Sequence, residues 1–408
     1  MSKVTKPVVL DETAKQVVAQ MQLQNEILTS LASGINYKPT SIKDVLNVVR
    51  AGQASKVFQV GDQIIVPWTD ITTGQKYDVP LDIVSFGTSA LQDGEELPSM
   101  TVQWHYATPF GVQFNQYQAF FYASEELAAG TYYIEIGTTW GNNCVSGKKY
   151  QFTLTKPVPA GGQLAGFRGA PDQAPSSWKV YSYNSKTAVD AIEIVAVTEG
   201  SSGTSLGVLR FGGDGKLNCL QRTAYGYNRW SQSAMRQWLN SDKGVGEWWT
   251  PQNDFDRCPD ELATKAGFLT GFDADFLEIL RPTKVVTALN TVTDSTSSNS
   301  VDPLETTYDK IYLPALEQMF IEPQLAGEGS AWDYWKRASN MTTKMKQYQT
   351  YPQIRTFAIE NHTSPQTVRL RSAHRGYSCN AWYVSSSGHV TGTNAIYALR
   401  CAPACDFC

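Results

Sequence analysis

The feature that most constrains how this chain folds is an alternation of apolar and polar residues around the turn sequence Ser386-Ser-Gly388. Trp382, Val384 and Val390 alternate with polar residues on the two sides of this turn. Successive side chains of a β-strand point to opposite faces of a sheet. Two strands joined here therefore form a β-hairpin with one apolar and one polar face. We expect the apolar face to pack on a core and the polar face to be accessible.

The polar face and its surroundings contain a restricted set of residue types. Each member can be produced from the asparagine codon AAC by changing only its adenines. Codons for Lys, Glu, Gln and Met cannot be produced in this way, and these four residues are absent between Arg371 and Arg400. The pattern predicts adenine-directed diversification of an exposed ligand-binding set, although a chance Ser/Gly/Thr-rich hairpin remains the alternative. The set comprises His374, Tyr377, Cys379, Tyr383, Ser385, His389, Thr391, Gly392, Thr393 and Ile396.

Short fixed sequences frame this set: Leu370-Arg-Ser-Ala, Asn380-Ala-Trp, Ser386-Ser-Gly and Ala398-Leu-Arg-Cys-Ala-Pro. With this frame the segment resembles the variable proteins of diversity-generating retroelements, of the phage major tropism determinant type. The resemblance implies a C-terminal C-type-lectin fold that displays randomised residues over about 371–400. Further motifs resemble an uncharacterised lectin-like domain of phage and gut-bacterial proteins, related in fold to formylglycine-generating enzyme. They are Asn228-Arg-Trp-Ser-Gln-Ser, Arg236-Gln-Trp-Leu-Asn, Asp309-Lys-Ile-Tyr-Leu-Pro and Tyr334-Trp-Lys.

The whole chain is expected to be α+β, with an N-terminal helix, an all-β module and the lectin-like domain. Strand-like runs such as 57–60, 63–66, 100–104 and 130–136 are separated by turn residues. Pro and Gly residues then indicate a linker. The expected ranges are 1–52 for a helical oligomerisation or attachment segment, 53–157 for a β-sandwich-like module, 158–177 for the linker and 178–408 for the ligand-binding domain. Within this last range, helices are predicted at 231–240, 273–280 and 314–320.

The N-terminal segment carries a heptad pattern. Its seam consists of Leu10, Ala14, Val17, Met21, Gln24, Leu28 and Leu31. An isolated helix of this length is marginal in water, so it must pack on something. A homotrimeric bundle, attachment to another virion protein and folding back onto its own chain remain open. Ser41 is then positioned to cap a second helix that stops at Gly52.

Composition narrows the class of protein. The chain of 408 residues has 12% aromatic residues and a formal net charge of −4, which suits globular domains and gives no broad basic surface for nucleic acid. No apolar run approaches the roughly 20 residues needed to cross a bilayer. The beginning of the sequence shows no signal-peptide core. We therefore expect synthesis in a host cytoplasm, virion localisation and no membrane insertion.

Several residues are predicted to form the scaffold beneath the diversified set. Trp332, Trp335 and Trp382 are expected in the core, together with Val384 and Val390. Arg371 and Arg400 either bridge strands around that core or lie on the surface. The core must hold the exposed residues rigidly whichever side chains they carry.

Residues suited to catalysis are few. The chain has four histidines, and His374 and His389 belong to the diversified set. Glu328 and Asp333 are the candidate pair for a hydrolase, and Cys379 and Cys401 for an oxidase of the related fold. The seven cysteines form no regular framework, and Cys405-Asp-Phe-Cys408 lacks a second ligand pair nearby. We expect no catalytic residue, no metal and no cofactor.

These observations predict a bacteriophage receptor-binding protein that is not an enzyme. Its partners would be a host-cell surface protein or glycan and other virion proteins, and it would assemble as a homotrimer. Tyr, Ser, Gly and Thr together give contact area and adaptable hydrogen bonding, as in antibody loops. A capsid decoration or head-fibre protein that binds glycans is one alternative. An oxidase or hydrolase of the related fold is the other.

Overall fold

The computed structural model describes residues 38–408 except 117–120, 124, 138–144, 159, 161–162, 165–178, 182–191, 194, 210–216, 220–226, 253–257, 291–302, 340–341, 351–356 and 378. It also describes residues 18, 21, 22, 25, 28 and 29 of the N-terminal segment. The described residues contain both helices and strands, and strands predominate. This agrees with the expected α+β class in its broad sense.

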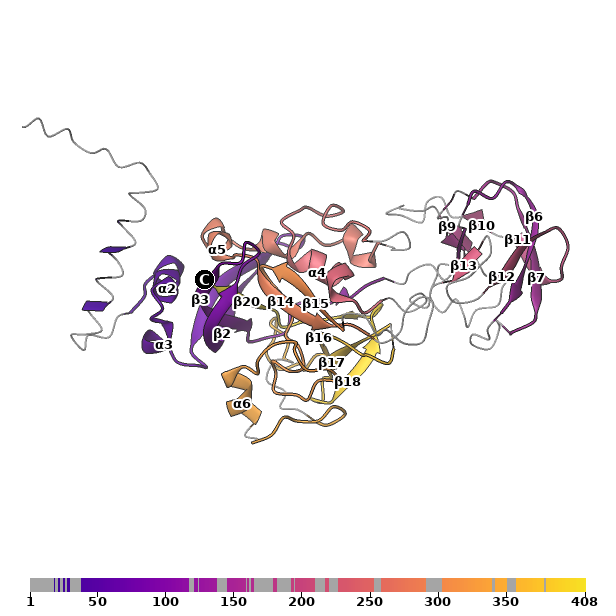
Figure 1. The fold of residues 1–408 in the computed structure, drawn as a ribbon. Coiled ribbons are helices and arrows are strands. Elements are labelled where there is room, and N and C mark those ends of the chain that lie inside the picture. The colour runs from indigo at the N-terminus through magenta and orange to yellow at the C-terminus, as the bar shows by residue number, and fades with distance from the viewer. Residues whose placement is uncertain are drawn as a thin grey trace, which may run out of the picture.

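A four-stranded sheet joins residues from the two ends of the described chain. Its order is β1 (Gln63–Asp70), β2 (Gln75–Ala90), β3 (Glu96–Trp104) and β20 (Ala404–Phe407), and all three pairs are antiparallel. In β3 the six residues from Ser99 to Trp104 are all buried, as expected for a strand covered on both faces. The last strand, next to the C-terminus marked in Figure 1, pairs with β3, and its four residues are buried as well.

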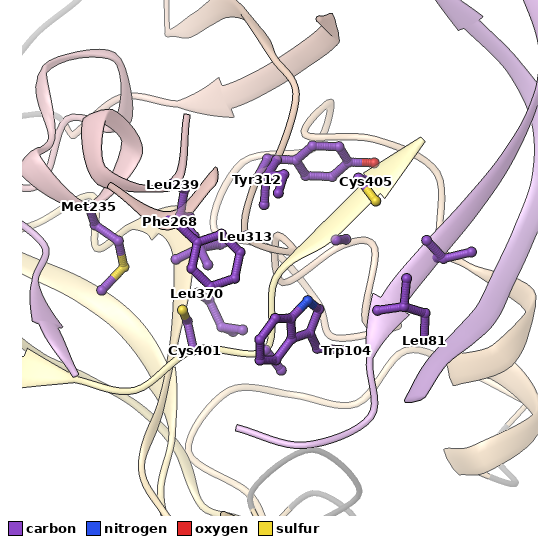
Figure 2. Packing of buried hydrophobic residues seen from close by; sticks show 14 of the residues in the cluster. Leu81, Trp104, Met235, Leu239, Phe268, Tyr312, Leu313, Leu370, Cys401 and Cys405 are labelled. Atoms are coloured by element: carbon purple, nitrogen blue, oxygen red, sulfur yellow. The ribbon is translucent and has the colours of Figure 1, made fainter. Parts of the chain in front are cut away.

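Around this sheet one hydrophobic core gathers residues from Val45 to Phe114 and again from Trp230 to Phe407. Figure 2 shows how Trp104, Phe268 and Leu370 meet in it although they come from distant parts of the chain. The Trp104 and Phe268 ring centroids lie 5.2 Å apart, within the range that aromatic pairs favour. The helices around this core are α2 (Ile42–Arg50), α3 (Ala54–Val57), α4 (Ala234–Leu239), α5 (Ala274–Ile279) and α6 (Asp333–Ser339), with single 3-10 turns η4 (Trp230–Gln232), η5 (Asp260–Ala263) and η6 (Phe268–Gly271).

Three small sheets complete this body. β14 (Thr283–Ala288) pairs with β15 (Leu304–Asp309), and β19 (Ala398–Leu399) pairs with β4 (Val112–Gln113). The third sheet has the order β16 (Val368–Ala373), β17 (Asn380–Val384) and β18 (Val390–Asn394). It contains the hairpin predicted from the alternation of residues.

The strands between residues 121 and 219 pair only with one another among the described residues. One sheet has the order β10-β9-β8-β5-β13 and the other the order β11-β7-β6-β12. Figure 1 shows this group apart from the body. Its strands are β5 (Phe121–Ala123), β6 (Gly130–Ile136), β7 (Lys149–Leu154), β8 (Gln163–Leu164), β9 (Lys179–Tyr181), β10 (Ile192–Glu193), β11 (Val195–Glu199), β12 (Thr204–Leu209) and β13 (Leu217–Cys219).

The structure thus divides the chain differently from the expected ranges. Residues 53–157 were expected to form one module and 178–408 another, but β1–β3 share a sheet and a core with the second range. The strands of 121–219 form an insertion within that body. The local sequence predicts strands equally well in the body and in the insertion. Only the long-range pairing of strands shows to which of the two a strand belongs. Most of the expected linker at 158–177 lies outside the described residues.

Local predictions had mixed outcomes. Ser41 caps α2 through a capping box with Asp44, and α4 and α5 occur where helices were predicted. A helix at 314–320 was wrong: the segment forms turns and ends at Phe320 with a φ of 61°. A strand at 57–60 was wrong as well, since Ala54–Val57 is helical. Most of the heptad segment lies outside the described residues, but Met21 and Leu28 are helical and exposed.

Candidate functional site

The candidate site is built on the hairpin of β17 and β18. Tyr383 pairs with Thr391, and Val384 pairs with Val390 at the turn end. Gly388 has a φ of 82°, which glycine adopts without steric strain. Gly388 also donates its N–H to the carbonyl of Ser385 at 2.8 Å. The sequence Ser386-Ser-Gly388 therefore fixes the register that sets which side chains face outward.

Side chains on the two faces of this hairpin differ in burial as the alternation predicted. Trp382, Val384 and Val390 are buried. The polar residues opposite them are partly exposed, namely Tyr383, Ser385, His389, Thr391 and Thr393. These five residues form what we call the polar face. None of them is acidic or basic apart from the imidazole of His389, so the polar face can offer hydroxyls and rings.

Other members of the predicted set do not lie on the polar face. His374 is 7% exposed and Ile396 is 2% exposed. The prediction that both are outward-facing contact residues was therefore wrong. The register of β16 shifts between Arg369 and Ala373, and this irregularity turns His374 onto Trp382, with ring centroids 5.0 Å apart. Ile396 follows β18 where the chain turns inward, and its carbonyl accepts a hydrogen bond from Gln113.

Three further members have distinct surroundings. Gly392 lies against the same histidine, because a Cβ placed on it would come 2.9 Å from His374 Cδ2. Cys379 is partly buried, and its Sγ lies 3.4 Å from Asn380 Oδ1. Tyr377 is 60% exposed and sits edge-on to His374. Five members of the predicted set therefore lie on the polar face, and His374, Tyr377 and Gly392 lie around Trp382.

Arg369 holds the hairpin by its main chain. The guanidinium is fully buried and donates to four backbone carbonyls: Ala381 at 3.0 Å, Thr393 at 3.2 Å, Asn394 at 2.9 Å and Tyr397 at 3.3 Å. Burial lowers the pKa of this guanidinium to about 9, which leaves it charged at neutral pH. Because its partners are carbonyls, these contacts do not depend on which side chains the hairpin carries.

Asn228 makes the same kind of contact on the other side. Its amide nitrogen lies within hydrogen-bonding distance of the carbonyls of His374 (3.2 Å), Tyr377 (2.9 Å) and Asn380 (2.6 Å). The amide oxygen of Asn228 accepts a hydrogen bond from Asn290 at 3.0 Å, so its orientation is fixed. The turn between β16 and β17 is thus anchored through its backbone too.

Arg371, proposed as a bridge or a surface residue, is fully buried and bridges segments. It donates to the carbonyls of Val286, Leu313 and Glu328. Burial raises the pKa of the Glu328 carboxyl, and the carboxyl accepts hydrogen bonds from Ser372 Oγ and the Ala288 amide. Arg400 bridges segments too, since its Nη1 donates to the Thr108 carbonyl at 3.1 Å and pairs with Glu360 at 2.7 Å.

The tryptophan anchors lie in the core. Trp332 and Trp335 are both buried. The indole nitrogen of Trp335 donates to Gln103 Oε1 at 3.2 Å. This hydrogen bond connects α6 to β3.

Sequence reasoning missed Arg369 and Asn228. A signal for Arg369 was present, since Val368-Arg-Leu-Arg371 places two arginines in an otherwise apolar strand. A buried arginine in a strand needs several acceptors. Asn228 begins the motif Asn228-Arg-Trp-Ser-Gln-Ser, which carries the resemblance to lectin-like domains, and no local pattern marks it as a backbone contact.

The candidate catalytic groups are buried or dispersed. Burial raises the pKa of the Cys379 thiol to about 11 and that of Cys401 to about 12, and a protonated thiol is a weak nucleophile. Glu328 is buried under Arg371, whereas Asp333 pairs with Lys336 on α6. Within the described residues no three His, Cys, Asp or Glu side chains are placed to hold a metal ion. The helices of that same part of the chain are too short or too polar to form a transmembrane span.

Comparison with known families gives one match: residues 216–406 fit a family described as a domain of unknown function, DUF6273. The matched residues include the hairpin, Arg369 and Asn228. A search of curated proteins found no match, and neither did a search of solved structures.

Proposed function

We propose that this chain is a bacteriophage receptor-binding protein whose C-terminal part has a C-type-lectin-like fold and carries a surface diversified by a retroelement. In this proposal the polar face of the hairpin binds a host-surface protein or glycan. The observation that carries it is the combination of the outward, adenine-reachable residues with the backbone anchoring by Arg369 and Asn228. A surface whose side chains change needs supports that do not contact those side chains.

The composition of the polar face supports binding rather than catalysis. Tyr383 provides a large amphipathic ring, and Ser385, Thr391 and Thr393 provide hydroxyls, which together suit adaptable recognition. The raised thiol pKa values of Cys379 and Cys401 give no support to an oxidase. The burial of Glu328 in a structural network gives none to a hydrolase.

The experiment that tests diversification is a comparison of gene neighbourhoods. A reverse transcriptase gene and a near-identical template repeat should lie close to this gene, and the repeat should differ from codons 371–400 only at template adenines. Sister genomes should differ at the codons of the polar face and agree at those for Arg369, Trp382 and Asn228. If no template exists and these nucleotides are invariant among sister genomes, the proposal is wrong.

Oligomerisation through the N-terminal helix is the second part of the proposal. Met21 and Leu28 are exposed on a helix in the single chain, and a bundle of three copies would cover them. Joining several weak sites raises the apparent affinity by about 10² to 10⁴. Sedimentation should give a trimer for the full chain and a monomer for Leu28→Asp. A monomeric full chain would contradict this part alone.

A further inference from the structure

A second group of rings, of which two are exposed and one is buried, lies on the opposite side of the hairpin from the polar face. Trp382 and Tyr383 are consecutive strand residues and so point to opposite faces. On the Trp382 side, Tyr348 is 56% exposed and Tyr377 is 60% exposed. Both rings contact His374, which stacks on Trp382 at an interplanar angle of 11°. We call Tyr348, His374 and Tyr377 the aromatic patch.

Tyr348 comes from outside the diversified segment and is held against it. Its amide donates to the Val390 carbonyl at 2.8 Å, and the Val390 amide donates to Gln349 at 3.0 Å. Its hydroxyl lies 3.0 Å from His374 Nε2, and its ring is edge-on to Trp382 at 5.4 Å between centroids. The segment before residue 350 therefore extends the edge of β18 and places one ring next to the hairpin.

The backbone of Tyr348 is strained. Its φ is 60°, a left-handed conformation that is uncommon for residues other than Gly, Asn and Asp. Strain of this kind costs about 1–3 kcal/mol and is concentrated at functional sites. Glycine would occupy the position without that strain. A half-exposed tyrosine in a position that favours glycine indicates that the ring itself is needed.

We infer that the aromatic patch is a carbohydrate-binding site in which Tyr348 is a constant contact residue. A constant ring beside changeable residues requires a constant feature in the ligand. Pyranose rings share a CH-rich apolar face, whereas their hydroxyls differ and can be read by variable neighbours. The inference rests on the proposed function, because it takes both a host-surface ligand and diversified neighbours such as Tyr377 as premises.

The size and charge of the aromatic patch fit a sugar better than a protein. A stable protein interface buries about 800 Å² per partner, and two tyrosine rings supply only a small part of that area. Asp, Glu and Lys are absent between residues 371 and 400, and the guanidinium of Arg375 donates to the Leu289 carbonyl at 2.8 Å. Burial lowers the pKa of His374, so the imidazole within the patch is neutral near pH 7. A neutral ligand with hydroxyls and an apolar face matches these groups.

The test uses the full-length chain on an array of bacterial and mammalian glycans. Wild type should bind a subset of glycans, and Tyr348→Gly should weaken that binding at least about tenfold, as expected for loss of a central aromatic contact. Tyr348→Phe retains the ring and should bind within about threefold of wild type. Tyr397→Ser, a change at another tyrosine that is 50% exposed, should bind as wild type does.

Urea unfolding of each variant separates binding from folding. We expect Tyr348→Gly to unfold at the same urea concentration as wild type or a higher one, since the relieved strain offsets the lost ring contact. The inference is overturned if wild type binds no glycan, or if Tyr348→Gly binds as tightly as wild type. Equal losses in Tyr397→Ser would also overturn it. The gene-neighbourhood comparison decides the diversification proposal independently of all these results.

Discussion

At the scale of single residues, the hydrogen bonds that anchor the hairpin do not involve the side chains of the polar face. Arg369 and Asn228 touch the hairpin only through carbonyl oxygens in the contacts described above, while Trp382 fixes it from the core. Each residue of the polar face can then vary without removing one of these contacts. The cost of substitution should therefore differ sharply between neighbouring positions.

Arg369→Met should lower the free energy of unfolding by about 3 kcal/mol or more, because it leaves several buried carbonyls without a donor. Arg369→Lys should recover only part of this loss, since one ammonium cannot span carbonyls from Ala381 to Tyr397. Urea denaturation measures both changes, with Arg337→Met on the exposed part of α6 as the control. A loss below about 0.5 kcal/mol, the range of ordinary surface changes, would contradict the anchoring role.

His374 should make stability depend on pH. Burial lowers its pKa in the folded state, so folding favours the neutral ring. Its contribution is complete above the unfolded pKa of about 6.5 and is lost as the pH falls from that value toward the lower folded pKa. The difference in unfolding free energy between wild type and His374→Gln should therefore shrink between about pH 8 and about pH 5. A constant difference would show that the ring is not buried in its neutral form.

At this scale the sequence allowed us to predict which side chains of a regular strand are buried, but not where the backbone departs from a regular strand. Trp382, Val384 and Val390 could be assigned to the core because a strand has a period of two. His374 and Ile396 could not be placed, because one lies beyond a register shift and the other beyond a turn. Period-two reasoning fails as soon as the backbone leaves the regular strand.

At the scale of elements, short helices are specified by their caps. Ser41 and Asp44 form a reciprocal capping box at the start of α2, and Asp273 accepts the Phe276 amide at the start of α5. Capping residues act within one helical turn, so these helix starts could be predicted from the sequence. The segment 314–320 has an equally good local signal, yet tertiary contacts of Gln318 and Phe320 hold it in turns.

Ser41→Ala should lower the free energy of unfolding by about 1 kcal/mol, because the Asp44 amide loses its acceptor. The loss should be visible in global unfolding, since Val45, Leu46 and Val49 of this helix belong to the main core. Ser330→Ala, at an exposed loop position, is the matched control. If both variants unfold alike, the helix is not held by this cap.

At the scale of the whole molecule, the body is discontinuous in sequence. Segments on the two sides of the interruption are in contact, since Met235 donates its amide to the Phe114 carbonyl at 3.2 Å. The contact between these segments could not be predicted from the sequence, because the strands of the body and of the insertion have similar sequence patterns. Which strands pair is decided by contacts between residues far apart, so the ranges of the domains could not be predicted.

Replacing residues 118–225 with a short glycine-serine linker should leave the body folded. Its buried tryptophans should retain their near-ultraviolet circular dichroism, and heating should give one cooperative transition. The linker joins two segments that the hydrogen bond between Met235 and Phe114 already holds together, so the entropic cost is small. A product with helical and strand signal but without the aromatic signal would show that the body needs the insertion.

The position of β20 also has a consequence for biosynthesis. Thr101 of β3 donates to Asp406 of β20, 305 residues later. Ribosomes add about 5–20 residues each second, so β3 emerges roughly 15–60 seconds before its neighbour exists. During that interval its edge is an unpaired template of backbone groups. Nascent chains of this protein should therefore depend on chaperones that shield a strand edge, and the body can close only after Phe407 has been added.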